Sequence, residues 1–350
     1  MTDETRSNQH GSNEATSNGA GSNEPTPADP AGDASTDSPA GTAAATTRDT
    51  SGAAPGQAGR RRLVVINNPA SGDASGQDEI GAAIADDDAS SGWHVEFSPT
   101  TEDDPGQGQA KDAVESGVDR ILVAGGDGTV RAVLESVAGT EVELAVLPLG
   151  TGNLLAGNLD IETGTDALPT ALGSSTRRLD VADVNGETFA VMAGMGFDAE
   201  MIRDADSDTK ARFGSVAYVI SAARHVRRNR FPGTVTVDGR EVWSGSAAMI
   251  LVGNCGSVTG GLPVFPDADP HDGRLDVAVL SVRSLREWAS VLVRLLTKKD
   301  QRPDLVQRWT AESVVVESRR DEPWELDGED RPPTRRLEFS IRPDSLTVVC

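Results

Sequence analysis

The sequence predicts an α/β domain followed by a mainly β domain, and two observations support this fold class. Between residues 60 and 175, short apolar runs alternate with segments of helical periodicity, as in a parallel sheet covered by helices. Between residues 176 and 335, turn dipeptides separate β-rich runs, which indicates mainly antiparallel strands. Residues 1–59 contain no Val, Ile, Leu or aromatic residue, so we expect an acidic, disordered tail before the first domain.

The first domain begins with a continuous apolar run, Leu63 to Ile66, which predicts a strand buried on both faces. The other strands predicted for this domain are Trp93 to Phe97, Arg120 to Ala124 and Leu144 to Leu147. The helices predicted between them are Asp78 to Ala89, Gln107 to Ser116 and Thr129 to Val137.

The second domain contains two dipeptides that favour tight hairpin turns, Asn185-Gly186 and Asp238-Gly239. Helical periodicity predicts one helix near Ser215 to Arg228 and another over Leu285 to Leu296. We therefore expect strand pairs with a few added helices in this part of the chain.

The formal net charge of −23 argues against nucleic acid as a partner, because phosphate backbones bind to basic surfaces. Asp and Glu together number 55, whereas Lys and Arg together number 32. Such an acidic balance suits concentrated salt, where screening weakens the repulsion between like charges. Our hypothesis is a halophilic host, with a haloarchaeon as the expected source.

Composition also restricts cofactors and location. Cys255, Cys350 and the four histidines lack metal-ligand spacing, which argues against zinc and iron. No apolar run approaches the roughly 18 residues of a membrane span, and the N-terminus lacks the apolar stretch of a signal peptide. We expect a cytoplasmic protein whose contact with the inner face of the membrane is peripheral.

The sharpest local motif is Gly125-Gly126-Asp127-Gly128-Thr129, which joins the end of a predicted strand to the start of a predicted helix. Glycines let the backbone approach a phosphate, free N–H groups at a helix start attract an anion, and Asp127 can reach magnesium or water. The alternative is a tight strand-to-helix turn without a ligand.

Two further turns follow neighbouring predicted strands. Pro148 to Asn153 contains Gly150-Thr151-Gly152, and Asn67 to Gly72 contains amide and hydroxyl groups suited to a nucleotide. Because the carboxyl ends of parallel strands lie at one edge of a sheet, where α/β proteins bind ligands, three such turns favour a nucleotide site.

These motifs resemble those of diacylglycerol-kinase-type lipid kinases, a family that includes sphingosine kinases. The resemblance extends over nearly all of residues 61–350 in the family's order. It is carried by Asn68 to Gly72, Gly125 to Thr129, Pro148 to Asn153, Pro266 to Gly273 and Asp327-Gly328-Glu329.

The resemblance implies an N-terminal α/β nucleotide-binding domain of the NAD kinase and diacylglycerol kinase type, a C-terminal β-sandwich, and a strand in residues 336–350 that returns to the first domain. It also implies ATP as phosphoryl donor and Glu329 as the general base for the lipid hydroxyl, with Asp127 as its catalytic partner. The residues then expected to contact ATP are Asn68, Ser71, Gly72, Thr101, Gly125, Gly126, Asp127, Gly128, Thr129, Gly150, Thr151 and Asn153. On its own, Asp-Gly-Glu is also an ordinary turn sequence.

The family further implies a structural magnesium ion in the second domain. Asp269, Asp272 and the backbone carbonyl of Arg274 match that site, and hard oxygen ligands suit magnesium. The alternative is solvated surface, because acidic pairs are common in so acidic a chain.

The chain departs from the family directly after the glycine motif, where many members carry Asn-Glu and this sequence has Arg131-Ala132. Arg131 is expected either to approach a phosphate or to lie on the helix surface. A separate basic cluster could meet anionic headgroups or complement a helix C-terminus. It comprises Arg224, His225, Arg227, Arg228 and Arg230.

Two other functions fit some of these features. The first is a NAD kinase, which shares the glycine motif and the two-domain plan, although Gly150 to Asn153 favours a lipid kinase. The second is a catalytically inactive nucleotide-binding protein. A dinucleotide oxidoreductase would need Gly-x-Gly-x-x-Gly after the first strand, which Asn67 to Gly72 does not supply. The expected partner is a lipid at the membrane surface, with a dialkylglycerol as one candidate acceptor and a homodimer as one candidate assembly.

Overall fold

In the computed structural model of the protein, the described residues are 59–69, 77–196, 230–258, 261–297, 299 and 301–350. Several sequence predictions fall on other residues and so lie outside this description. They are the N-terminal tail, Ser71 and Gly72, the helix near Ser215 to Arg228, and Arg224, His225, Arg227 and Arg228 of the basic cluster.

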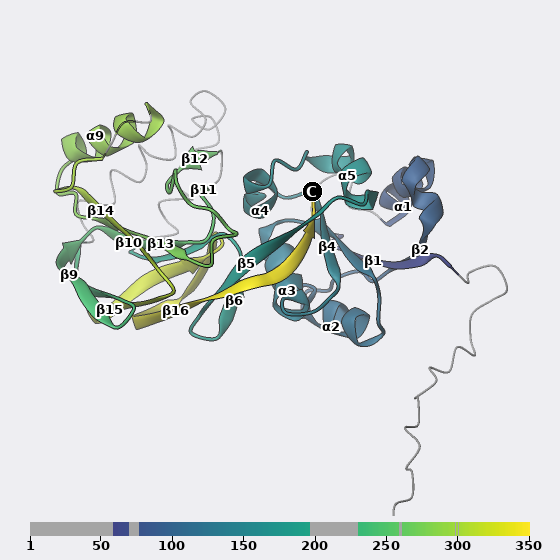
Figure 1. The fold of residues 1–350 in the computed structure, drawn as a ribbon, viewed down its shortest axis with the longest axis horizontal. Coiled ribbons are helices and arrows are strands. Elements are labelled where there is room, and N and C mark those ends of the chain that lie inside the picture. The colour runs from purple at the N-terminus through teal and green to yellow at the C-terminus, as the bar shows by residue number, and fades with distance from the viewer. Residues whose placement is uncertain (1–58, 70–76, 197–229, 259–260, 298, 300) are drawn as a thin grey trace, which may run out of the picture. The chain divides into compact units, whose positions relative to one another are not determined.

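The first part of the fold is a parallel sheet with helices on both faces, as predicted (Figure 1). Its strands are β1 (Arg61–Asn67), β2 (Trp93–Phe97), β3 (Arg120–Gly125) and β4 (Glu143–Pro148). Its helices are α1 (Gln77–Asp86), α2 (Gln107–Glu115), α3 (Asp127–Val137), α4 (Leu154–Asn158) and α5 (Leu168–Leu172), with 3₁₀ turns η1 (Asp88–Gly92) and η2 (Gly164–Ala167). The predicted helix at Asp78 to Ala89 is shorter than expected, because the chain turns into η1 at Asp88.

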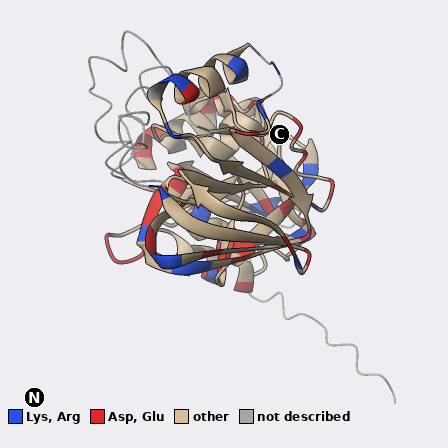
Figure 2. Cartoon of the chain, turned by 90° about the vertical axis from the view of Figure 1, so that its left-hand side faces the viewer, with Lys and Arg blue, Asp and Glu red and all other residues tan. Residues whose placement is uncertain are grey.

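The second part consists mainly of antiparallel strands around an apolar core of its own. Its strands are β5 (Thr176–Val184), β6 (Glu187–Phe189), β7 (Met192–Met195), β8 (Phe231–Val237), β9 (Arg240–Ala247), β10 (Met249–Gly253), β11 (Ser257–Val258), β12 (Leu262–Pro263), β13 (Leu275–Leu280), β14 (Val306–Ala311), β15 (Ser313–Leu326) and β16 (Glu329–Val349). Its described helix is α9 (Leu285–Leu296), which has the bounds that the sequence predicted. Figure 2 shows basic and acidic segments side by side on the strands of this part.

One strand, β16, joins the two parts into a single 14-stranded sheet with the main order β14-β13-β10-β7-β15-β16-β4-β3-β1-β2. Its first half pairs antiparallel with β15, and its last residues pair antiparallel with β5 and parallel with β4. The strand that returns to the first domain is therefore continuous with a sandwich strand and begins at Glu329.

Three hairpin turns follow the conformation that their dipeptides favour. Asn185-Gly186 joins β5 to β6 with φ of 51° and 90°, and Asp238-Gly239 joins β8 to β9 with φ of 48° and 78°. Asp327-Gly328 has φ of 45° and 83° and turns β15 into β16. Positive φ at both central residues matches the right-handed twist of the flanking strands.

Strand β15 carries a carboxyl group on the side opposite to the sandwich core. Trp324 and Leu326 are buried in that core, so the intervening Glu325 points to the other face, where its side chain is also buried. Burial, with added repulsion from Asp330 and Asp327, raises the pKa of Glu325 to about 8.

We therefore predict that Glu325→Gln flattens the pH dependence of stability. Between the ordinary pKa of 4.5 and about 8, the folded state keeps a proton on Glu325 that the unfolded chain loses. The free energy of unfolding should thus fall as pH rises, by up to about 1.4 kcal/mol per pH unit, and Gln should remove this contribution.

Denaturant unfolding from pH 4 to pH 9 measures this difference. The control is Glu135→Gln, which changes an exposed glutamate on α3. Equal slopes for wild type and Glu325→Gln would contradict the prediction.

Candidate active site at the carboxyl edge of the parallel sheet

Turns that follow β1, β3 and β4 meet at one edge of the sheet. The backbone N–H of Asn68 donates to the carbonyl of Ala124 at 3.0 Å, and that of Leu149 donates to the carbonyl of Gly125 at 3.0 Å. The Asn68 amide lies 3.5 Å from the Thr129 hydroxyl. The structure therefore brings together the three turns that the sequence singled out, as far as their residues are described.

Two glycines make the closest approach between these turns. A Cβ added to Gly150 would lie 2.5 Å from the Cα of Gly126, and a Cβ added to Gly126 would lie 3.2 Å from the Cα of Gly150. The atom that the added Cβ of Gly150 would meet is the backbone Cα of Gly126, so the clash cannot be relieved by rotation of a side chain. Gly126 is also the N-cap of α3 and makes no side-chain cap, so the first N–H groups of this helix point into the same edge.

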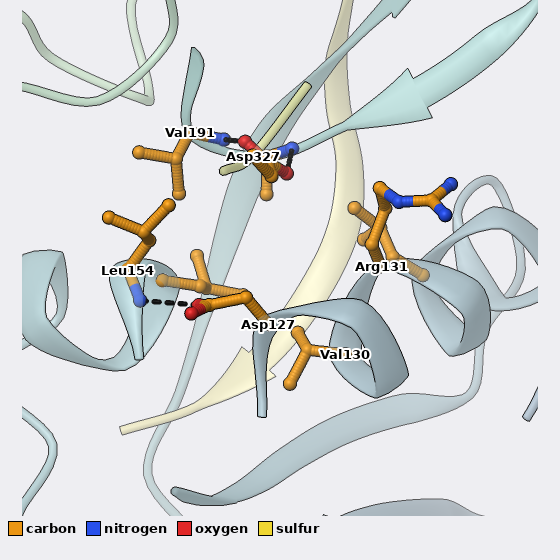
Figure 3. A pocket seen from close by; sticks show the side chains of 9 residues that line it. Asp127, Val130, Arg131, Leu154, Val191 and Asp327 are labelled. Atoms are coloured by element: carbon orange, nitrogen blue, oxygen red, sulfur yellow. Dashed lines mark hydrogen bonds between the residues drawn. The ribbon is translucent and has the colours of Figure 1, made fainter. Parts of the chain in front are cut away.

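Asp127, the first residue of α3, holds the next helix in place. Its Oδ1 accepts a hydrogen bond from the N–H of Leu154, where α4 begins. Burial raises the pKa of Asp127, hydrogen bonds from Leu154 and Asn153 oppose that rise, and the nearby Glu329 carboxylate adds to it. Asp127 and Asp327 line one narrow pocket together with Leu154 and Val191 (Figure 3).

Asp327 anchors the β15–β16 turn to the sandwich. Its carboxylate accepts three backbone hydrogen bonds of 2.9 to 3.0 Å, from Ala190, Val191 and Met192. Burial raises the pKa of Asp327 to about 6, although these three donors lower it. The buried carboxylate fixes the position of the turn, and with it the start of β16.

Glu329, the first residue of β16, lies over the first turn of α3. A Cβ added to Gly128 would lie 2.4 Å from Glu329 Oε1, so this carboxylate oxygen occupies the space beside the glycine motif. Glu329 Oε2 accepts hydrogen bonds from Arg131 and from Arg331. Two residues that the sequence predicted as catalytic partners, Asp127 and Glu329, are thus at the same helix start.

Of three other residues expected to contact a nucleotide, Thr101 and Asn153 have local structural roles and Thr151 is exposed. The Thr101 hydroxyl accepts from the N–H of Asp104, and Thr151 is exposed. The Asn153 side chain accepts from the N–H of Gly150 at 3.0 Å and donates to its carbonyl at 2.9 Å, while its own φ is 47°. Asn153 therefore shapes the turn around Gly150.

The residues expected to bind a structural metal ion form a tight loop before β13. Asp269 accepts from the N–H of His271, and Asp272 accepts from the N–H of Arg274. Asp180 accepts from the N–H of Gly273 at 2.7 Å and links the loop to β5. Within the described residues, no three His, Cys, Asp or Glu side chains come together as a metal-binding group.

Asp327, Arg331 and Glu187 belong to the site, although the sequence analysis gave them no role. Arg331 could have been recognised, because residues i and i+2 of a strand share a face and Glu329 precedes it by two. The contact between Arg331 and Glu187, at 2.8 Å, joins residues far apart in the sequence, and no local pattern predicts it.

Two protein families match the chain, one on each part of the fold. Residues 62–184 match the diacylglycerol kinase catalytic domain. Residues 191–350 match the YegS C-terminal NAD kinase beta sandwich-like domain.

Known proteins resemble the chain over both parts. The probable lipid kinase YegS-like of Pseudomonas aeruginosa is 30% identical over 284 residues, which cover 79% of this chain and 91% of that protein. The diacylglycerol kinase of Mycobacterium tuberculosis is 30% identical over 213 residues, covering 59% of this chain and 69% of that protein. A crystal structure of a diacylglycerol kinase from Bacillus anthracis has the same fold, with a TM-score of 0.66 at 24% identity over 83% of this chain and 96% of that chain.

We predict that Gly150→Ala destabilises the protein by about 1 to 3 kcal/mol, because the added Cβ would push the two glycine turns apart. The matched control is Gly157→Ala in α4, where an added Cβ meets nothing within 4 Å and should leave stability equal or higher. Chemical denaturation measures both variants. Equal stability of the two would show that the turns separate without cost.

Proposed function

Because the chain belongs to the family of lipid kinases with a diacylglycerol kinase catalytic domain, we propose that it transfers the γ-phosphoryl group of ATP to a hydroxyl of a diacylglycerol-like lipid. The observation that carries this proposal is the position of Glu329 Oε1 beside Gly128, at the start of α3. A carboxylate at that point is close to where the phosphates of a nucleotide would meet the acceptor.

The glycine turns are the proposed phosphate site. Gly126 and Gly150 let the backbone approach a phosphate, and the uncapped N–H groups at the start of α3 favour negative charge. Asn68 and the Thr129 hydroxyl lie beside them. Thr101 and Thr151 are at the same edge and complete the proposed nucleotide contacts among the described residues.

In the proposed reaction, Glu329 accepts the proton of the lipid hydroxyl while the hydroxyl oxygen bonds to the γ-phosphorus. The bond from that phosphorus to the bridging oxygen of ATP breaks, and ADP leaves with the electron pair. Phosphoryl transfer depends mainly on positioning and charge stabilisation, so no covalent enzyme intermediate is required.

We propose magnesium at two places. Asp127 offers a carboxylate oxygen to the ion that accompanies ATP, and an ion there would supply neutralising charge for the phosphates. Asp269, Asp272 and the carbonyl of Arg274 offer hard oxygen donors for a structural ion. The pKa of the neighbouring Asp276 is raised to about 6, first by burial and then by the charges of Asp272 and Asp267, while Arg308 and Arg274 lower it.

The proposed site of action is the inner face of a membrane. Every helix among the described residues is too short or too polar to span a bilayer. Helix α9 exposes Val293 (57%) and Leu296 (48%), and the segment from Arg283 to Arg302 is basic in an acidic chain. Exposed apolar groups beside cations suit a peripheral contact with anionic lipid.

The strongly acidic composition supports a protein that works in concentrated salt. A halophilic host would make dialkylglycerols natural acceptors, and we propose them as the first lipids to test. A homodimer stays a prediction.

The test is transfer of labelled phosphate from Mg-ATP to dialkylglycerols, diacylglycerols, sphingoid bases, polyprenols and NAD, in vesicles or solution at low and molar salt. Lipid product should appear with wild type and fall about 10² to 10⁴-fold with Glu329→Gln, because the base is lost. The control is Glu135→Gln, an exposed glutamate on α3 that should keep full activity. Product on NAD would indicate a NAD kinase, and no product on any acceptor would indicate an inactive nucleotide-binding protein.

A second prediction concerns Gly128→Ala. The new Cβ would lie 2.4 Å from Glu329 Oε1, so it should displace the carboxylate and lower lipid phosphorylation by about tenfold or more. Alanine favours a helix, and this opposes the cost of moving the Glu329 carboxylate away from Arg131 and Arg331, so the free energy of unfolding should change by less than about 1 kcal/mol. Assays of lipid phosphorylation and of chemical denaturation on the same variant test whether activity falls while stability is kept. Full activity in the variant would contradict the prediction.

A further inference from the structure

Arg131 connects helix α3 to the sandwich strands at the proposed base. Its Nε and Nη2 donate to Glu329 Oε2 at 3.1 and 2.8 Å, and its Nη1 lies 3.8 Å from a carboxylate oxygen of Glu187. Arg331 approaches Glu329 at 3.3 Å and Glu187 at 2.8 Å. Two guanidinium groups and two carboxylates thus alternate around one point between α3, β6 and β16.

The two carboxylate oxygens of Glu329 have different neighbours. The hydrogen bonds from Arg131 and Arg331 all end on Oε2, whereas Oε1 faces the first turn of α3 at Gly128. A carboxylate held at one oxygen by two cations has little freedom to rotate. Oε1 is therefore kept in one direction, towards the glycine motif.

The partial burial of this cluster makes its ion pairs effective. The side chains of Arg131 and Arg331 are only 16% and 12% exposed, whereas those of Glu329 and Glu187 are 37% and 38% exposed, so solvent reaches the carboxylates but screens these pairs less than pairs with two exposed partners. The planar guanidinium of Arg131 donates through two nitrogens to one oxygen, a geometry that a lysine ammonium cannot reproduce.

We propose that Arg131 is a positioning residue, which acts through Glu329 and orients Oε1 as the proton acceptor. This inference rests on the proposed lipid kinase reaction. In that reaction the hydroxyl proton passes to Oε1, and Arg131 keeps Oε2 occupied so that the basic oxygen faces the acceptor. In this role Arg131 acts on the carboxylate of Glu329 and needs no contact with the substrate or the transferred group.

The test compares Arg131→Met and Arg131→Lys in the lipid phosphorylation assay. The Met variant should lower kcat by about tenfold to a hundredfold and leave KM for ATP within about twofold, because only the geometry of the base changes. The Lys variant should restore part of kcat. In a Glu329→Gln background, Arg131→Met should cause no further loss.

The control is Arg335→Met on β16, which removes an exposed ion pair with Asp321 of β15 and should keep full activity. The positioning role would be overturned if Arg131→Met left kcat unchanged or changed only KM. It would also be overturned if Arg131→Met lowered kcat equally in the wild-type and Glu329→Gln backgrounds. A kcat loss that Arg335→Met reproduces would overturn it as well.

A stability cycle separates failure of this inference from failure of the proposed function. Melting temperatures of Arg131→Met, Glu329→Gln and the double variant report the contact without any activity. If the change in melting temperature of the double variant equals the sum of the changes in the two single variants, the two side chains do not interact, which overturns the inference. If the shifts are coupled but wild type phosphorylates no lipid, the proposed function fails, and the positioning role is rejected with it.

Discussion

The pairing of β16 with strands of both parts of the fold is the constraint on which the site depends. At its start β16 pairs with β15, and near its end Thr347 and Val348 pair with Glu143 and Leu144 of β4. Backbone hydrogen bonds therefore tie Glu329, the proposed base, to the same sheet whose strands end in the glycine turns. Movement of Glu329 away from α3 would require loss of ladder hydrogen bonds or bending of this strand.

A second constraint is the concentration of carboxylates at the point where the two parts meet. Asp327 is buried and Asp127 is half-buried, so burial raises the pKa of each, and the charge of Asp127 raises the pKa of Asp327 further. Three backbone donors stabilise the carboxylate of Asp327, and Arg131 and Arg331 bind the carboxylate of Glu329. The fold thus combines negative charge where a metal-bound nucleotide is proposed with fixed cations behind the base.

Local rules predicted much of the fold because they act within a few residues. Alternation of apolar runs and helices gave the parallel sheet, and Asn185-Gly186 formed the expected turn because both residues accept positive φ. The same rules could not predict that Asn153 turns back to Gly150, since that depends on its left-handed backbone. They also could not predict the contact between Arg131 and Glu329, which are 198 positions apart.

The departure at Arg131 is best understood with the composition of the chain. At about 1 M salt the Debye length falls to roughly 3 Å, so exposed pairs such as Arg335 with Asp321 lose most of their attraction. In the pair of Arg131 with Glu329 the arginine is 16% exposed and the glutamate 37%, so salt screens this pair less than one with two exposed partners. In an acidic protein adapted to salt, an arginine at a partly buried position would therefore hold the orientation of a carboxylate. A contact between solvent-exposed groups would hold it less firmly, because salt screens such a contact more.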